Sequence, residues 1–231
     1  MKISVIIPIY NEEQYVEKII SKVNSVNIEK EIIVVDDGST DNSLKIIKNL
    51  QFKNFKIISN TKNHGKGYSI RVALKYTNNQ IIIIQDGDLE YDPNDYFKLI
   101  EQFKKNNVHV VYGSRFLGTK RFILHKGINY NFRALVNLCL TNLFNKLYNQ
   151  NISDLHTCYK AFDRKIISKL NLEEDGFSFC PEFSAKVSKL GYKIHEVLVS
   201  YNPRSKSQGK KINFFDGFSA IKAIVKYKLF N

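Results

Sequence analysis

Short apolar runs alternate with longer amphipathic stretches over the first half of the chain. The predicted strands are residues 3–7, 31–35, 55–59, 81–84 and 108–112. Each of the first four is followed by apolar positions at helical spacing, which predicts strands connected by helices. Such connections favour a mostly parallel sheet wound in right-handed crossovers. The isoleucine run 81–84 has no polar position, so we expect it to be the central strand, buried on both faces.

Local signals predict where two of the helices begin and which side they bury. Asn11 can cap a helix after the first strand, with Gln14 reaching back in a capping box. The helix after the central strand is expected to turn Phe97, Ile100 and Phe103 towards the core.

The alternation of strands and helices stops near residue 115. Residues 119–148 mix apolar residues at helical spacing with basic side chains. They predict one or two amphipathic helices, which either pack on the sheet or lie on an anionic membrane; core packing is slightly favoured. The remaining predictions are a loop and short strand at 154–162, a last strand at 193–199, a basic loop at 205–211 and a basic helix at 214–230.

Composition limits the classes of protein to consider. The 231 residues are 43% hydrophobic and 25% charged, as in a globular chain long enough to bury a core. The net charge of +13 predicts attraction to nucleotide phosphates, an acidic membrane surface or nucleic acid. Three widely spaced cysteines argue against a disulfide framework or a zinc site and fit a reducing cytoplasm. No stretch approaches the length of a membrane span, so we expect a soluble or peripheral protein.

Acidic residues follow the predicted central strand. Asp86 and Asp88 are two apart and project to the same side of an extended backbone, with Glu90 two further on. Carboxylate oxygens suit Mg²⁺ or Mn²⁺, which typically completes its shell with substrate phosphates. The alternative is a polar turn in which Asp92 or Asn94 caps the next helix and the other acids are solvated.

Polar residues also follow the other predicted strands, at 8–12, 36–39, 64–67 and 113–115. In a parallel sheet these segments meet at one edge, which favours a nucleotide pocket. The glycines of 64–67 lack the third glycine of a dinucleotide-binding loop and follow the third strand instead of the first.

The segments VIIPIYNE, VVDDGSTD, NHGKG, DGDLEYDP and GSRF, in this order and spacing, resemble the family 2 glycosyltransferases of the GT-A fold. DLHTCYKAF and YNPRSKSQGKK resemble the polyprenyl-phosphate branch of that family, the dolichol-phosphate mannose and glucose synthases. The resemblance covers nearly the whole chain. It implies an α/β, Rossmann-like domain over residues 1–231, with a nucleotide-sugar half (1–115) and an acceptor half (116–231) that contains the amphipathic helices.

The resemblance also implies roles for residues on the donor side. The donor-binding residues would be Pro8, Tyr10, Glu12, Asp37, Lys66 and Asp86. Asp88 and Glu90 would ligate Mg²⁺ or Mn²⁺, although the branch often carries glutamine at the position of Glu90. The alternative for Asp36 and Asp37 is that they cap the helix beginning near Thr40.

The implied reaction is displacement at the anomeric carbon of the sugar, with inversion and departure of a nucleoside diphosphate. The residues implied in catalysis are Asp88, Arg115, Asp154, Arg204 and Lys210, of which the three basic ones would neutralise the diphosphate and an acceptor phosphate. A hydroxyl acceptor would need a base, and Asp154 and Glu182 are the candidates. A phosphate acceptor is already anionic at neutral pH. Asp154 would then only position Lys160 and the acceptor; the alternative is an aspartate that caps a loop.

The resulting hypothesis is a metal-dependent transferase that moves a hexose from a UDP- or GDP-sugar to polyprenyl phosphate at the cytoplasmic face of a membrane. The nearest alternative has the same fold and a saccharide or protein hydroxyl as acceptor. A sugar-phosphate nucleotidyltransferase would need a Gly-rich basic loop where residues 8–12 read PIYNE. Nucleic-acid binding is suggested only by charge and aromatic content, and is not expected. The sequence leaves the oligomeric state open.

Overall fold

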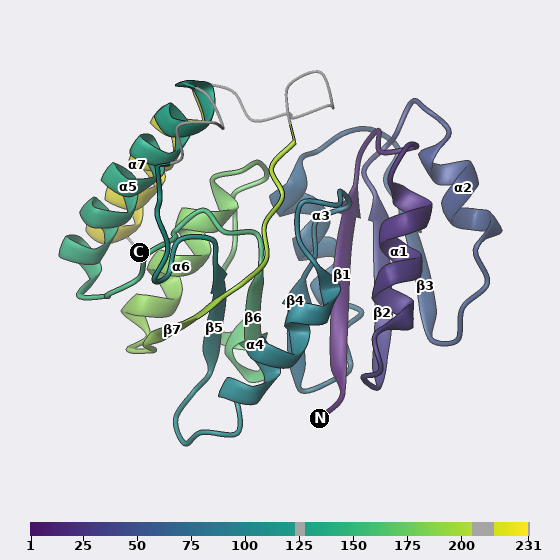
Figure 1. The fold of residues 1–231 in the computed structure, drawn as a ribbon, viewed down its shortest axis with the longest axis horizontal. Helices are drawn as coiled ribbons and strands as arrows, with labels where there is room; N and C mark the ends of the chain where they lie inside the picture. Colours follow the sequence, from purple (N-terminus) through teal and green to yellow (C-terminus); the bar gives the residue numbers. More distant parts are fainter. Residues whose placement is uncertain (123–127, 205–214, 231) are drawn as a thin grey trace.

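The computed structural model of this chain describes residues 1–122, 128–204 and 215–230 (Figure 1). The described strands form one seven-stranded sheet with the order β3-β2-β1-β4-β6-β5-β7. They are β1 (Ile3–Ile9), β2 (Lys30–Asp36), β3 (Phe55–Ser59), β4 (Ile81–Ile84), β5 (Val110–Ser114), β6 (Lys160–Asp163) and β7 (Ile194–Leu198). The helices are α1 (Val16–Ser25), α2 (Ser43–Asn49), α3 (Lys66–Leu74), α4 (Tyr96–Gln102), α5 (Ile128–Tyr148), α6 (Phe179–Lys189) and α7 (Phe215–Leu229), with 3₁₀ turns η1 (Pro93–Asp95) and η3 (Arg164–Lys169).

The sheet is mostly parallel, as the alternating pattern predicts. β1 pairs in parallel with β2 and β4, β2 with β3, and β5 with β7. β6 runs antiparallel to both of its neighbours, β4 and β5. The predicted α/β architecture with a mostly parallel sheet flanked by helices is therefore confirmed. The loops that follow the parallel strands meet at one edge, the upper edge in Figure 1.

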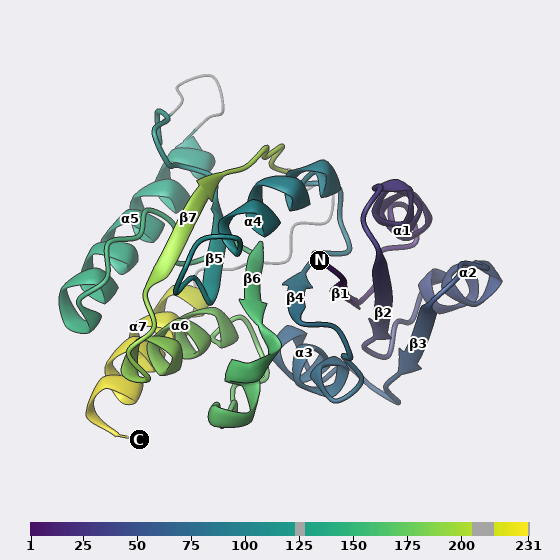
Figure 2. The same cartoon turned by 90° about the horizontal axis from the view of Figure 1, so that it is seen from below.

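Helices cover both faces of the sheet (Figure 2). One hydrophobic core includes residues of α1, α2 and α4, and the other includes residues of α3, α5, α6 and α7. β4 contributes to both, because Ile81 and Ile83 belong to the first core, whereas Ile82 and Ile84 belong to the second. All four isoleucines are fully buried, which confirms that this strand lies between two helical layers.

α5 is a single helix of 21 residues. Its inner side packs in the core through Leu140, Phe144 and Tyr148. Its outer side exposes Phe132 and Leu135. The slightly favoured expectation of core packing therefore describes one side of the helix only. Across the described parts of the chain, we find no helix with the length and apolar character needed to cross a bilayer.

Two local predictions are wrong. Asn11 does not cap α1, which begins at Val16 without a side-chain cap; Asn11 has φ +49° and its side-chain oxygen accepts from the Thr40 backbone N–H at 2.8 Å. Phe97 is 51% exposed. The buried side of α4 instead includes Tyr96, whose hydroxyl donates to the side-chain oxygen of Gln85 at 2.7 Å and so fixes the rotation of the helix.

The first turn of α3 is pressed against the segment before α6. A Cβ atom added at Gly67 would collide with the carbonyl oxygen of Glu174 and the Cβ of Phe179. The Tyr68 backbone N–H also donates to the carbonyl oxygen of Asp175 at 3.1 Å. Only glycine therefore allows this approach, which fixes the position of the Lys66 side chain at the edge of the sheet.

We predict that Gly67→Ala destabilises the protein by about 1–3 kcal/mol, because the new methyl group forces the two backbones apart. Gly176→Ala is a matched control, since a Cβ there meets nothing within 4 Å. Urea unfolding followed by circular dichroism measures both variants. Equal stability of the two would show that α3 and the 173–176 segment separate freely.

Candidate active site

Three acidic side chains follow β4 in a turn that packs on the end of β1. Gly87, between Asp86 and Asp88, lies against β1, because an added Cβ would meet the side chain of Ile9 and, at 3.2 Å, the carbonyl oxygen of Pro8. The predicted Pro8 is thus next to the acidic turn, with Tyr10 following β1. The sheet therefore places the ends of the first and fourth strands in direct contact.

Lys66, the first residue of α3, forms an ion pair with Asp86. Its ammonium group also lies 3.2 Å from the Sγ atom of Cys158. Burial raises the pKa of Asp86, but the attraction of Lys66 outweighs it and holds the pKa below its usual range. The two predicted donor-binding residues are therefore brought together as a partly buried charged pair.

Arg204 connects two acidic groups from distant parts of the chain. Its Nη1 atom lies 2.8 Å from Glu12 Oε2, and its Nη2 atom lies 2.8 Å from Asp88 Oδ2. Its backbone N–H donates to Glu90 Oε1 at 2.6 Å. One arginine thus holds together the turns that follow β1 and β4 and the segment that follows β7.

The carboxylates of this site fit a divalent cation. Burial and the neighbouring Asp86 and Glu90 raise the pKa of Asp88 to about 7, although Arg204 opposes the shift. In the described part of the chain, no three His, Cys, Asp or Glu side chains form a ready-made metal cage. Mg²⁺ is commonly held by one or two carboxylates that share the ion with substrate phosphates. The guanidinium of Arg204 already contacts Asp88, so this position accepts a positive charge. The negative charge of Asp88 and Glu90 therefore also suits a metal ion.

Asp37 ties the loop that follows β3 to the edge of the sheet. Its carboxylate accepts from the backbone N–H groups of His64 at 3.0 Å and Gly65 at 2.6 Å, and from the side chain of Asn60 at 2.7 Å. Asp36, by contrast, accepts from the Ser39 backbone N–H within its own turn. The binding of a base or ribose by Asp37 stays a prediction.

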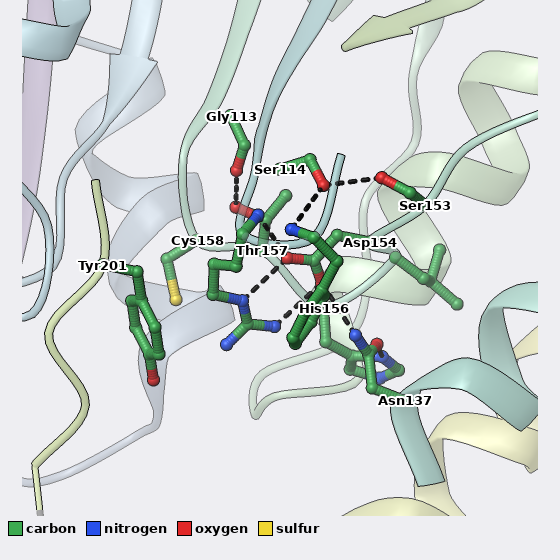
Figure 3. A network of polar contacts seen from close by, with 12 residues as sticks. Gly113, Ser114, Asn137, Ser153, Asp154, His156, Thr157, Cys158 and Tyr201 are labelled. Carbon is green, nitrogen blue, oxygen red and sulfur yellow. Dashed lines mark hydrogen bonds and ion pairs between the residues drawn. The ribbon is translucent and has the colours of Figure 1, made fainter. Parts of the chain in front are cut away.

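Figure 3 shows the polar contacts around Asp154, which forms a second ion pair with Arg115. The carboxylate of Asp154 accepts from Arg115 Nε at 2.7 Å, from Arg115 Nη2 at 2.8 Å and from the side chain of Asn137 at 2.9 Å. Asp154 is completely buried. Burial raises its pKa, but Arg115 and the hydrogen bonds lower it below the usual range. A carboxylate so fully engaged is a weak base, and its main effect is to fix the guanidinium of Arg115.

Tyr201 joins the two charged groups of side chains. Its hydroxyl donates to Glu90 Oε2 at 2.9 Å, and its ring centroid lies 5.0 Å from Arg115 Cζ. The acidic turn and the Arg115–Asp154 pair are therefore parts of one site.

Arg121 adds a second guanidinium near Arg115. The Cζ atoms of Arg121 and Arg115 lie 4.0 Å and 5.3 Å from the ring centroid of Phe116. Arg121 Nη2 donates to the carbonyl oxygen of Ser153, whereas its buried Nη1 has no hydrogen-bond partner among the described residues. A buried donor without a partner is costly, so this position favours an anionic or polar ligand.

Some predicted residues have other roles or lie elsewhere. Glu182 is fully buried and accepts from the backbone N–H groups of Glu173 and Glu174, so it anchors the segment before α6. The positioning of Lys160 by Asp154 is wrong, because Lys160 donates to the carbonyl oxygens of Leu155 and Thr157. Lys210 and the basic loop 205–211 lie outside the described residues.

Sequence reasoning missed Asn137, Tyr201 and Arg121 as members of the site. Asn137 and Thr141 are buried polar residues in an otherwise apolar stretch of α5, and this spacing of four was an available signal. Tyr201 lay inside a segment quoted for its basic residues. For Arg121, no local signal distinguishes it from other surface cations.

Comparisons with known proteins agree with this arrangement. The family model described as Glycosyl transferase family 2 matches residues 4–170. A dolichol-phosphate mannosyltransferase of Pyrococcus furiosus is 34% identical over 120 residues, covering 51% of this chain and 34% of that protein. An undecaprenyl-phosphate 4-deoxy-4-formamido-L-arabinose transferase of Proteus mirabilis is 26% identical over 187 residues, covering 78% and 54%. The chain thus spans about half, or less, of the length of these two relatives.

A solved structure shares the fold. Glucosyl-3-phosphoglycerate synthase from Mycobacterium tuberculosis, in complex with Mn²⁺, UDP-glucose and phosphoglyceric acid, superposes with a TM-score of 0.73 at 16% identity. The match covers 100% of this chain and 80% of that one. The seven-stranded arrangement is therefore a GT-A-like fold.

We predict that Arg204→Gln tightens the binding of Mn²⁺ alone by about tenfold, because a charge-assisted contact worth about 1.5–3 kcal/mol no longer competes for Asp88. The same change is expected to weaken UDP or GDP binding, since a cation for the diphosphate is lost. Isothermal titration calorimetry measures both affinities, with the exposed Arg164→Gln as control. Unchanged Mn²⁺ affinity would contradict a shared position of the guanidinium and the metal.

Proposed function

Because the chain belongs to glycosyl transferase family 2, we propose that it transfers a hexose from a UDP- or GDP-sugar to a polyprenyl phosphate. The configuration at the anomeric carbon of the sugar would be inverted, and a nucleoside diphosphate would leave. The acceptor is the finer part of this proposal. It rests on the groups that surround Arg115.

The proposal rests on one observation: both carboxylates that could act as a base already accept hydrogen bonds from other groups of the protein. Asp154 is occupied by Arg115 and Asn137, and Glu182 by two backbone N–H groups and Lys186. A hydroxyl acceptor needs a group that removes its proton. A phosphate acceptor needs positive charge instead, because it is already anionic at neutral pH.

The cationic groups near Arg115 meet that need. The bidentate contact with Asp154 fixes the guanidinium of Arg115 in one orientation, and the buried Nη1 of Arg121 is available to a further acceptor atom. Preorganised donors of this kind stabilise an anion without reorganising during the reaction. The two arginines would hold the acceptor phosphate and aim one of its oxygens at the sugar.

The acidic turn would act on the donor. A divalent cation held by Asp88 and Glu90 would supply positive charge to the departing diphosphate. Arg204 would move from Asp88 towards the same phosphates, because its guanidinium can contact the negative charge of the diphosphate in place of the negative charge of Asp88. Lys66 would hold Asp86 in its charged form, so that Asp86 can accept hydrogen bonds from hydroxyls of the sugar or ribose.

Two relatives support a lipid-linked phosphate acceptor, because the name of one contains dolichol-phosphate and the name of the other contains undecaprenyl-phosphate. The glucosyl-3-phosphoglycerate synthase supports a second candidate, because the acceptor in that structure is phosphoglyceric acid, a small phosphorylated molecule. Each of these acceptors carries a phosphate. The arrangement of Arg115 and Arg121 suits either, and the solubility of the product separates them.

The direct test incubates the protein with labelled UDP- and GDP-sugars, Mn²⁺ and polyprenyl phosphate, followed by extraction into organic solvent. We expect label in the organic phase for one donor. Removal of the metal with a chelator should abolish the transfer, and Arg121→Gln should raise the acceptor KM by about tenfold, the effect of one lost charged hydrogen bond. Label that remains in water for every donor would overturn the lipid acceptor.

We also predict that Asp154→Asn and Glu182→Gln both lower stability, since breaking a buried ion pair costs about 3–5 kcal/mol. Only Asp154→Asn should raise the acceptor KM, because it releases Arg115, and its kcat should fall less than tenfold. Steady-state kinetics with thermal unfolding separate the two effects. A fall in kcat of about 10²–10⁴-fold at unchanged acceptor KM would identify Asp154 as a base and favour a hydroxyl acceptor.

A further inference from the structure

Gln85 is a fully buried polar residue between the central strand and the acidic turn. It follows the four isoleucines of β4 directly. Its backbone N–H donates to the carbonyl oxygen of Ile6 in β1 at 2.9 Å, next to the paired part of the two strands. An amide side chain in such an apolar place is costly unless its hydrogen bonds are made. Its partners therefore indicate what the residue does.

Two buried tyrosines donate to the side-chain oxygen of Gln85. The hydroxyl of Tyr96, the first residue of α4, lies 2.7 Å from this oxygen, and the hydroxyl of Tyr159, which precedes β6, lies 2.6 Å from it. Burial raises the pKa of both phenols well above the usual value, so both stay protonated and each needs an acceptor. The amide oxygen has two lone pairs and accepts both bonds. The three side chains thus form one polar group inside an apolar core.

The side-chain nitrogen of Gln85 faces the acidic turn. It donates to the backbone carbonyl oxygen of Asp86 at 3.1 Å. Because a carbonyl oxygen only accepts hydrogen bonds, the amide nitrogen must face Asp86 and the amide oxygen must face the two tyrosines. Among the described residues, no other donor contacts this carbonyl oxygen. The tyrosines therefore hold the amide group, and the amide group holds the turn.

The carbonyl group held in this way belongs to the peptide between Asp86 and Gly87. Glycine has no Cβ, so its backbone can adopt more conformations than that of any other residue. Asp86 and Asp88 lie on either side of this glycine, and each pairs with a different cation, Lys66 and Arg204. Rotation of the peptide would therefore change how the two carboxylates lie relative to each other.

We infer that Gln85 is a positioning residue, which holds the acidic turn in the geometry that binds the metal ion and the donor diphosphate. The inference rests on the proposed function, because it takes Asp86 and Asp88 to act on the donor. Gln85 is fully buried, so it acts through the backbone of Asp86 and not by direct contact with a ligand. Groups that are fixed in advance need no rearrangement when a ligand arrives, so a turn without this hydrogen bond would bind more weakly.

The test separates positioning from stability. Gln85→Met leaves two buried phenols without an acceptor and should lower the urea midpoint of unfolding. The triple variant Gln85→Met, Tyr96→Phe, Tyr159→Phe removes these polar groups together and keeps similar shapes, so its midpoint should return close to that of the wild type. Its affinity for UDP or GDP with Mn²⁺, measured by isothermal titration calorimetry, should nevertheless stay about fivefold weaker, the effect of one lost hydrogen bond.

Single variants decide the question even if the triple variant does not fold. Tyr159→Phe keeps the ring, removes one donor to Gln85 and should weaken nucleotide binding about threefold. Tyr112→Phe is the matched control, because Tyr112 is equally buried and its hydroxyl lies 2.6 Å from Ser184 Oγ in the core on the other face of the sheet. It should leave nucleotide binding unchanged. Equal losses in these two variants, or nucleotide binding that recovers with stability in the triple variant, would overturn the inference.

Hydrogen–deuterium exchange of residues 86–91, measured without any ligand, separates this inference from the proposed function. We expect the backbone amides of the turn to exchange about fivefold faster in the triple variant than in the wild type. Faster exchange, in a protein whose wild type binds neither UDP nor GDP with Mn²⁺, would support the positioning role of Gln85 and reject the proposed function. Unchanged exchange and unchanged nucleotide affinity in the triple variant would do the reverse.

Discussion

The structure depends on the neutralisation of several carboxylates that the sheet brings to one edge. Glu12, Asp88 and Glu90 are at most 8% exposed, and buried charges of like sign are unfavourable unless cations reach them. The cations come from distant segments, Lys66 from α3 and Arg204 from the chain after β7. Each ion pair therefore stabilises the site and also fixes how two parts of the fold are joined. The same arrangement leaves the site ready to exchange one cation for another.

In the Arg115–Asp154 pair, the pairing of a buried carboxylate with a cation fixes the orientation of the arginine. Asp154 makes its contacts deep in the protein, where the pair is shielded from water, and so holds Arg115 in one orientation. Two of the N–H groups of the guanidinium, Nε and one on Nη2, point at Asp154. The Cζ atom of the same group lies 5.0 Å from the centroid of the Tyr201 ring, and the Tyr201 hydroxyl donates to Glu90. Positive charge is thus positioned next to the acidic turn by a residue whose own acid–base chemistry is suppressed.

The sequence allowed the fold and the acidic turn to be predicted, because both follow from local patterns. The isoleucine run of β4 and the polar residues after each strand are read from neighbouring positions, and parallel pairing then brings the strand ends together. Contacts between distant positions were not accessible in this way. Arg204 contacts Glu12, which lies 192 positions away in the sequence. Asn11 does not cap the helix as expected, because it accepts a hydrogen bond from Thr40, 29 positions away. The prediction that Phe97 is buried was wrong for a related reason, since the hydrogen bond of Tyr96 with Gln85 sets the rotation of α4.

α5 shows why composition alone could not decide between core packing and a surface role. The helix carries apolar residues on both sides, and a pattern of this kind fits a buried helix as well as one that lies between a core and a lipid surface. Its inner side provides Asn137 to the carboxylate of Asp154, so the helix must pack on the sheet. Its outer side has no such duty, and apolar residues there lower solubility unless something covers them. A polyprenyl phosphate has an anionic head and an apolar tail, and a helix with a polar contact on one side and an apolar surface on the other can serve both parts of such a molecule at once.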